Sequence, residues 1–466
     1  MKDLDAIVNG YEKDIIQATC DLVEIPSMAE DPEGSMPFGR EDYRAMEYTM
    51  DLCGRLGLTA RNLDGYIGYA TYGQGPEMVG VLVHMDVVPG GTGWDTPPFV
   101  ATIKDGAIYG RGTCDDKGPL VAALYALRSV MDSGAAFKKE VRVIFGCDEE
   151  SGYMRDTHHY KELGERDPDF VFSPDSQYPV INAEKTILHM KYNMKPVQPS
   201  GEGIRILSIQ AGERINVVPA ECKAVLSAPD ADKAVEELKR KAAELDIQIT
   251  ISHTGGNIEL TTHGVMAHAS TPEDGKNAIA GMLTLLSQMQ LAGGTNESAV
   301  KLFARHIGMS SYGEHMGLDV KDEPTGRLTM NMGIIQADEK GFELRVDHRI
   351  PVLYPSEDVL ARLQEAFGSA CIIATLVHTK GIYVPADNPS VKKLLEVYEA
   401  QTGLKGYAFG VGGGTYAREF KCGVSFGPYL PGEAHLAHQA NEHIHIDRLM
   451  MNARIMAHAI KELACE

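Results

Sequence analysis

The chain has 466 residues, of which 44% are hydrophobic and 23% are charged, and its formal net charge is −21. This length predicts two or three packed domains, and the composition excludes a disordered or fibrous chain. The acidic balance disfavours nucleic acid and an anionic membrane surface as partners, whereas metal cations and small zwitterions remain compatible.

The chain lacks the patterns of export and of membrane insertion. Its first 25 residues carry charges every few positions, and no later segment approaches the roughly 20 consecutive apolar residues of a membrane span. The eight cysteines are scattered and form no CxxC pair, which is typical of reduced thiols. We therefore expect a cytoplasmic protein.

Helical and strand patterns alternate over the first 185 residues, which predicts an α/β domain. Residues 41–57 and 117–134 have helical character, and the second of these ends on Gly134. The apolar runs within 77–90 and 140–152 read as buried strands.

Polar clusters follow the apolar segments of this first part of the chain. They are His84 with Asp86, Asp115 with Asp116, and Asp148 to Glu150. In open α/β sheets, functional sites lie beyond the carboxyl ends of the strands. The sequence therefore predicts a site at this sheet edge.

From about residue 186 the pattern changes to that of a separate α+β domain, with helices predicted over 231–245 and 277–291 and a hairpin joining 328–335 to 342–350. After about residue 383 the α/β pattern returns, with helices near 390–402 and 447–464. We predict a catalytic domain formed by 1–185 and 383–466, interrupted by an inserted domain at 186–382.

Each polar cluster has a structural interpretation and a functional one. His84 and Asp86 leave the same face of a strand, which suits a ligand with its orienting partner and also an ordinary polar strand end. Asp115 and Asp116 fit either an acidic helix N-terminus or a carboxylate shared by two cations. Glu149 and Glu150 fit a surface turn, or a general base beside a metal ligand.

Taken together, the clusters favour the functional interpretation. Asp175 follows another apolar segment, and "GEAHLAHQANEHIHI" near the C-terminus adds four histidines. Histidines and acids placed beyond successive strands match the ligand set of a two-metal hydrolase better than a coincidence of helix caps.

Five ordered motifs carry a resemblance: "HMDVVP", "GRGTCDDKGP", "DEESG", "SPDSQYP" and "AHQANE". In this order they resemble the M20 family of metallopeptidases, and above all its PepV-like or Sapep-like dipeptidases. The likeness runs nearly from end to end. It implies an α/β catalytic domain, a mixed sheet flanked by helices, interrupted by an α+β lid domain.

The resemblance implies roles for the motif residues. Asp86 orients the ligating His84, Glu149 is the general base, and Asp115 bridges both metals. Asp116 is the neighbour of Asp115 across a peptide bond that is often cis in the family. The implied ligands of one metal are His84, Asp115 and Asp175, and those of the other are Asp115, Glu150 and His438.

The inserted domain resembles the family's lid. It implies that His268, in "GVMAHAS", polarises the scissile carbonyl, and that Asn216 and Arg349 bind the C-terminal carboxylate of the substrate. The loop "GGGTYAR" matches a family loop that lines the pocket, with Gly413, Gly414 and Thr415 as further substrate-binding candidates.

These likenesses imply a metal-dependent dipeptidase that uses two divalent ions, zinc or manganese, on small peptides. The alternatives within the same fold are an aminoacylase, a carboxypeptidase and a β-alanyl dipeptidase. A non-catalytic metal-dependent binding protein would not need Glu149, and a cysteine hydrolase using Cys114 has no marked base. A monomer is favoured, with a homodimer as the alternative.

Overall fold

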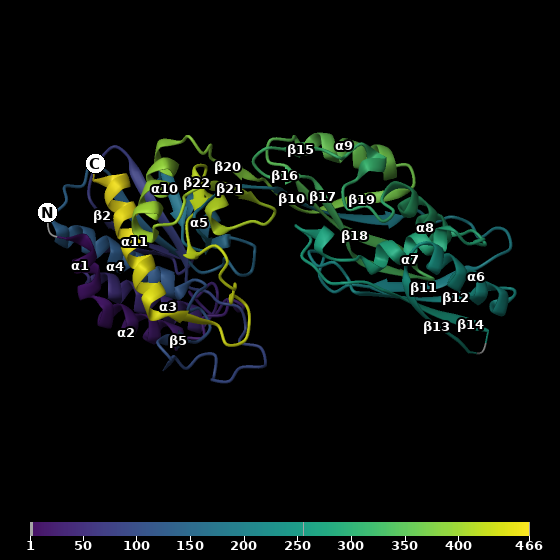
Figure 1. Cartoon of the computed structure of the whole chain (residues 1–466), viewed down its shortest axis with the longest axis horizontal. Helices are drawn as coiled ribbons and strands as arrows, with labels where there is room; N and C mark the ends of the chain where they lie inside the picture. Colours follow the sequence, from purple (N-terminus) through teal and green to yellow (C-terminus); the bar gives the residue numbers. More distant parts are fainter. Residues whose placement is uncertain (1–2, 255, 466) are drawn as a thin grey trace. The chain divides into compact units, whose positions relative to one another are not determined.

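The computed structural model describes residues 3–254 and 256–465, and these divide into two compact units (Figure 1). The first unit contains the described residues up to Ala183, Ile382–Phe409 and the residues from Thr415 onward. The second contains Glu184–Gly381 and Gly410–Gly414.

The segment Gly410–Gly414 groups with the second unit, although it lies within the range 383–466 predicted for the catalytic domain. Its glycines let the backbone approach the second unit closely. A Cβ at Gly410 would lie 1.9 Å from the carbonyl oxygen of Pro324, and one at Gly412 would lie 2.7 Å from the Cβ of Ser270.

The first unit is built on a mixed sheet whose central strands β6, β3, β7 and β22 are parallel, with antiparallel neighbours toward its edges. In spatial order the strands are β1 (Thr59–Leu63), β2 (Ile67–Tyr72), β6 (Glu140–Gly146), β3 (Met78–His84), β7 (Phe170–Ser173), β22 (Gly423–Ser425), β9 (Val180–Glu184) and β20 (Ile382–Tyr383), with β21 (Ala408–Val411) beside β9.

Both faces of this sheet are covered, which explains its continuous apolar strands. Val81 and Val83 of β3 belong to the large core that includes α4 and α11, whereas Leu82 belongs to a smaller core with Tyr160 and Tyr416. The helices are α1 (Leu4–Gly10), α2 (Glu12–Val23), α3 (Arg40–Arg55), α4 (Lys117–Ser133), α5 (Arg155–Glu162), α10 (Pro389–Thr402) and α11 (Ile446–Ala464). The predicted stop of α4 at Gly134 is confirmed, since this residue caps the helix at φ 74°.

Two short sheets and a 3-10 helix complete the first unit. They are β4 (Thr102–Lys104), β5 (Ala107–Tyr109) and β24 (His443–His445); β8 (Ser176–Gln177) with β23 (Pro428–Tyr429); and η3 (Tyr416–Glu419). Because β24 pairs with β5, the C-terminal histidine-rich segment lies beside the segment that leads to Asp115.

The second unit has an antiparallel sheet with helices packed into its hydrophobic core. Leu188, Met190 and Tyr192 of β10 are buried in that core, while the alternate residues His189 and Lys191 are only partly buried, as expected for a sheet covered on one face. In spatial order its strands are β13 (Gln248–Thr254), β14 (Asn257–His263), β12 (Glu221–Ser227), β11 (Arg205–Ala211), β17 (Thr329–Asp338), β18 (Gly341–Ile350), β10 (Thr186–Met194) and β19 (Cys371–Thr379).

The remaining elements of the second unit are α6 (Ala231–Glu244), α7 (Ala278–Ser287), α8 (Thr295–His306), α9 (Ser356–Phe367), η1 (Pro272–Asp274), η2 (Glu314–Met316), β15 (Lys321–Asp322) and β16 (Gly326–Arg327). The helix predicted over 277–291 ends early because Gln290 and Ala292 instead make backbone hydrogen bonds with Ile204. In the predicted hairpin, both strands extend into the expected connection, so that Asp338 pairs with Gly341.

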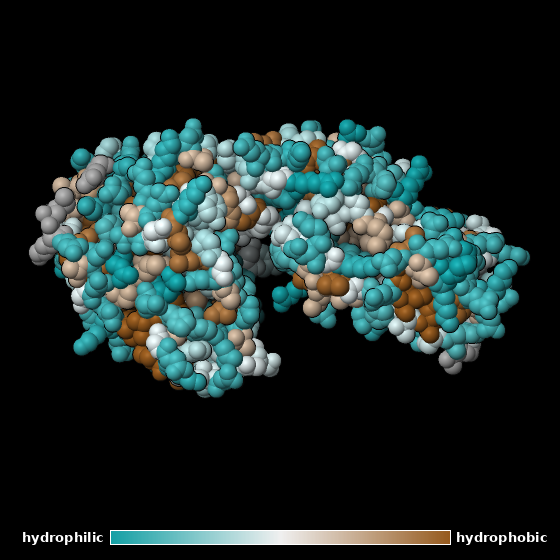
Figure 2. Space-filling view, viewed as in Figure 1, coloured by the Kyte–Doolittle hydropathy of each residue, from teal (hydrophilic) through white to brown (hydrophobic). Residues whose placement is uncertain are grey.

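Hydrophilic residues cover most of the face drawn in Figure 2 for each unit. Within residues 3–254 and 256–465, no helix is both long and apolar enough to cross a membrane.

Candidate metal centre

Three strands of the first unit deliver polar side chains to one edge of the sheet. His84 is the last residue of β3, Glu149 and Glu150 follow β6, and Asp175 follows β7. These strands are parallel, so their carboxyl ends meet at the same edge. The predicted convergence of these clusters is therefore seen in the structure.

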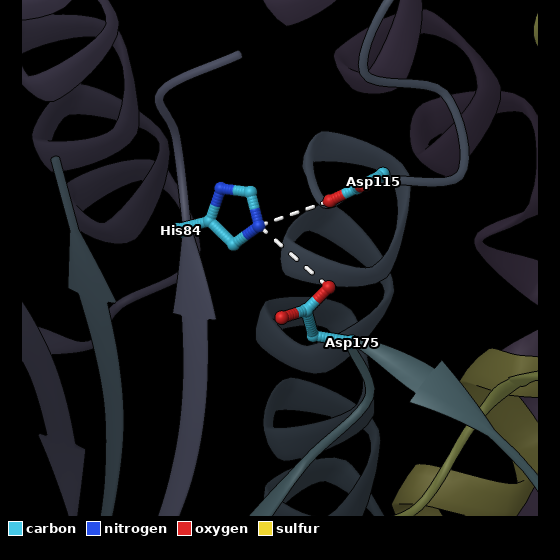
Figure 3. A group of neighbouring side chains, drawn as sticks. All are labelled: His84, Asp115 and Asp175. Carbon is cyan, nitrogen blue, oxygen red and sulfur yellow. Dashed lines mark hydrogen bonds and ion pairs between the residues drawn. The ribbon is translucent and has the colours of Figure 1, made fainter. Parts of the chain in front are cut away.

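His84, Asp115 and Asp175 form one set of converging donor atoms (Figure 3). The Nε2 atom of His84 lies 3.0 Å from Oδ1 of Asp115 and 3.7 Å from Oδ1 of Asp175. The other ring nitrogen, Nδ1, is 2.9 Å from the backbone oxygen of Asp86. A proton on Nδ1 would be donated to that carbonyl, which leaves Nε2 free to bind a cation.

Asp115, Glu150 and His438 form the second set. The Nε2 atom of His438 lies 2.9 Å from Oε2 of Glu150 and 3.2 Å from Oδ2 of Asp115. Asp115 thus presents one carboxylate oxygen to each set. A side chain placed in this way is suited to bridging two cations.

The spacing of the donor atoms fits divalent cations. Ligands held 2.0–2.2 Å from a tetrahedral ion lie roughly 3.4 Å apart, and the contacts within the two sets span 2.9–3.7 Å. The charge also fits, because hydrogen bonds to Asp115 and Glu150 raise the pKa of His438 to about 10. The cluster therefore attracts positive charge where the ions would bind.

The Asp86 carboxylate contacts both His84 and the segment that follows β6. It lies 3.5 Å from Nδ1 of His84, whose closer partner is the backbone oxygen of the same residue. The carboxylate also accepts hydrogen bonds from the backbone N–H groups of Glu149, at 3.3 Å, and Glu150, at 2.9 Å. Asp86 therefore fixes the segment that carries these two glutamates.

Asp116, to which sequence reasoning assigned no role, also contributes to the site. Its peptide bond to Asp115 is cis, and its buried Oδ2 accepts a hydrogen bond from the backbone N–H of His84 at 3.2 Å. Burial raises the pKa of Asp116 well above its usual value, and the charge of Asp175 adds to this. No sequence pattern links residues 84 and 116, so no local signal could have indicated this contact.

Glu149 lies outside both donor sets. Burial raises its pKa well above the usual value, and the negative charge of Asp175 adds to the effect. A carboxyl group with a raised pKa can both accept and return a proton near neutral pH. The adjacent Asp148 is engaged elsewhere, through two hydrogen bonds of 2.7 Å with the guanidinium of Arg155.

His268, Asn216 and Arg349 lie in the second unit. The Nδ1 atom of His268 accepts a hydrogen bond from the backbone N–H of Ser270 at 3.2 Å, so the ring proton is on Nε2. Desolvation and the charge of Arg349 lower the pKa of His268, which favours the neutral form of its ring. The backbone oxygen of Asn216 accepts from the N–H of Ala269, beside His268.

Arg349 is held by Asp347 rather than standing free. Its Nε and Nη2 each donate to the Asp347 carboxylate at 2.8 Å, and its Nη1 donates to the backbone oxygen of Gly412 at 3.2 Å. A guanidinium has five N–H groups, so these three contacts leave one N–H on each terminal nitrogen.

The glycine-rich loop is divided between the two units. Gly413 and Gly414 belong to the second unit, whereas Thr415 belongs to the first and its Oγ1 lies 2.7 Å from the hydroxyl of Ser425. Of the other C-terminal histidines, His435 contacts Gln177 and lies outside both donor sets.

Comparison with known proteins identifies the family. The model of peptidase family M20/M25/M40 matches residues 80–462. The chain is 35% identical over 97% of its length to YtjP of Bacillus subtilis (strain 168), whose name carries a provisional dipeptidase assignment, covering 98% of that protein. It is 32% identical over 98% of its length to the Beta-Ala-Xaa dipeptidase of Lactobacillus delbrueckii subsp. lactis, covering 96% of that protein.

Solved structures support the fold. The aminopeptidase PepT from Bacillus cereus matches with a TM-score of 0.59 at 16% identity, over 97% of this chain and 98% of that one. Human carnosine dipeptidase 1 matches with a TM-score of 0.58 at 14% identity, over 99% and 98%. The expected fold class is thus confirmed, and this chain belongs to peptidase family M20/M25/M40.

Proposed function

We propose that this peptidase is a two-metal dipeptidase that cleaves dipeptides with a free C-terminal carboxylate. The observation that carries the proposal is Asp115, whose two oxygens face one donor set each. Such a pair of neighbouring cation sites suits hydrolysis of an unactivated amide. Relatives of similar full length that are named for dipeptidase activity support the substrate class.

The first cation would be held by His84, Asp115 and Asp175, and the second by Asp115, Glu150 and His438. Three carboxylates and two imidazoles accept either Zn²⁺ or Mn²⁺. When bound, the ions supply Lewis acidity toward the peptide carbonyl and toward water.

The chain's own residues supply the proton transfers and the positioning. Glu149 takes a proton from the attacking water and returns it to the leaving amine, a role that its raised pKa supports. His268, neutral with its proton on Nε2, donates a hydrogen bond to the oxygen that becomes negatively charged.

Substrate length is limited by recognition of the C-terminal carboxylate. Arg349, held rigid by Asp347, offers its remaining N–H groups to this carboxylate, with Asn216 as a second donor. Gly413, Gly414 and Thr415 line the substrate pocket in this proposal. The similarity to a Beta-Ala-Xaa dipeptidase makes β-alanyl dipeptides a second substrate class to test.

We further propose that the protein acts in the cytoplasm as a monomer on small peptides, without nucleic-acid or membrane partners. The free, buried thiols of Cys114 and Cys147 fit a reducing compartment. The net charge of −21 supports the exclusion of phosphate backbones.

The test is turnover by the metal-stripped protein after addition of Mn²⁺, Zn²⁺ or Co²⁺, measured on one panel of substrates. The panel contains α-dipeptides, β-alanyl dipeptides, tripeptides and N-acyl amino acids. Metal-dependent cleavage that is fastest with α-dipeptides supports the proposal. Preference for N-acyl amino acids would identify an aminoacylase, preference for longer peptides a carboxypeptidase, and tight peptide binding without turnover a binding protein.

A further inference from the structure

The carboxylate of Glu442 holds the backbone that leads to Asp115. Its Oε1 accepts hydrogen bonds from the N–H groups of Gly112 at 3.1 Å, Cys114 at 2.9 Å and Asp115 at 3.3 Å. Glu442 is fully buried and lies four residues after His438. One oxygen atom thus fixes the Asp115 loop to the segment that carries His438.

Arg111 makes the same connection from the opposite side. Its Nη1 donates to Oε2 of Glu442 at 2.8 Å and to the backbone oxygen of Gln439, the residue after His438, at 3.2 Å. Its guanidinium also lies 5.2 Å from the ring centroid of Trp94. The loop before Asp115 and the segment after His438 are therefore held together from both sides: Glu442 binds the loop backbone, and Arg111 binds Glu442 and the backbone of Gln439.

The first donor set is supported in another way. His84 ends β3, which pairs along its whole length with β6, and Asp175 follows β7, which pairs with β3 and β22. Two of the three members of this set are thus placed by the central sheet. In the second set, both Asp115 and His438 lie in turns outside the strands.

The chemistry of the pair argues against a purely stabilising role. Burying an ion pair is commonly no more stable than packing apolar side chains of similar volume. Here the burial is nearly complete, with Arg111 2% exposed and Glu442 0%. Moreover, Nε of Arg111 has no hydrogen-bond partner among the described residues, which adds a desolvation cost.

We infer that Arg111 and Glu442 are a positioning pair for the second cation site, made by Asp115, Glu150 and His438. The inference rests on the proposed two-cation centre. Breaking the pair loosens the Asp115 loop and the His438 segment relative to each other, so binding of the second cation is weakened more than that of the first. This split between the two sites is what a general structural role would not produce.

The test is calorimetric titration of the metal-stripped protein with Mn²⁺, together with the metal content after dialysis. In Glu442→Gln the amide oxygen can still accept from the loop, but its NH₂ group opposes Arg111. We expect the second binding step to weaken by about 10–100-fold, while the first changes by less than about threefold. Glu165→Gln is the matched control, because this carboxylate pairs with Arg142 and Arg61 instead.

Arg111→Lys provides a second, milder variant if Glu442→Gln does not fold. It keeps the positive charge but loses the planar guanidinium whose Nη1 donates to both Glu442 and Gln439, so we expect the same split with a smaller loss. Equal weakening of both steps, or unchanged binding, in the folded variant would overturn the inference. If the wild type itself binds fewer than two ions, the proposed centre fails instead.

Discussion

Replacing Asp86 by Asn tests whether its carboxylate holds the backbone of Glu149 and Glu150. The carboxylate of Asp86 accepts from the backbone N–H groups of Glu149 and Glu150, whereas the imidazole of His84 is held by the backbone oxygen of Asp86. The substitution leaves that backbone oxygen in place. We therefore expect Asp86→Asn to disturb the two glutamates and to spare His84.

The magnitude follows from the hydrogen bonds that change. An Asn oxygen can keep one of the two backbone partners, but its NH₂ group faces the other N–H. Losing one buried hydrogen bond to a charged group lowers the free energy of unfolding by about 1.5–3 kcal/mol. A displacement of Glu149 by about 1 Å lowers kcat by about 100-fold.

Two assays separate these effects. Trp94 is the single tryptophan of the chain and lies in the first unit, so its fluorescence in urea follows the unfolding of that unit. Steady-state kinetics and metal content then show whether catalysis fails with the cations still bound. Wild-type kcat would refute the assignment of Asp86 to the glutamate segment, and so would loss of the cation held by His84 before loss of the cation held by Glu150.

Three further results are expected. Chelation should abolish activity. Alkylation by iodoacetamide should leave activity intact, because burial and the charge of Glu442 raise the pKa of the Cys114 thiol. Inactivation by alkylation of Cys114 would contradict this. Burial lowers the pKa of His348 from 6.5 to about 4, so the second unit should be most stable above pH 6.5 and lose up to about 3 kcal/mol as the pH falls toward 4. Thermal melts followed by circular dichroism should show this loss, and an unchanged loss in His348→Gln would disprove its origin. Arg349→Met should raise KM for a dipeptide by about 10–100-fold, because a charged hydrogen bond worth about 1.5–3 kcal/mol is lost. The change in kcat should be smaller. An unchanged KM would exclude carboxylate binding by Arg349.

Local sequence signals predicted the elements and the residues at their ends. His84 and Asp175 follow apolar runs, and because parallel strands end at one sheet edge, the convergence of these side chains could be expected from the sequence alone. The glycine after α4 likewise marked the end of that helix. These features depend on neighbouring residues, which a sequence displays directly.

The supports of the site could not be predicted in this way. Glu442 reaches the N–H of Gly112, a residue 330 positions away, and Asp116 reaches the N–H of His84. Such contacts depend on how separate segments meet, and no periodicity marks them. The spacing of His84 and Asp86 indicates a shared strand face, but it could not show that the Asp86 carboxylate also accepts from the N–H groups of Glu149 and Glu150.

The central claim is that Glu149 is the base of a centre that binds two cations without it. The most direct measurement is dipeptide turnover by Glu149→Gln, with the metal content determined on the same sample. We predict that both cations remain bound while kcat falls by about 10²–10⁴-fold. Near wild-type turnover in the metal-loaded variant would contradict the account.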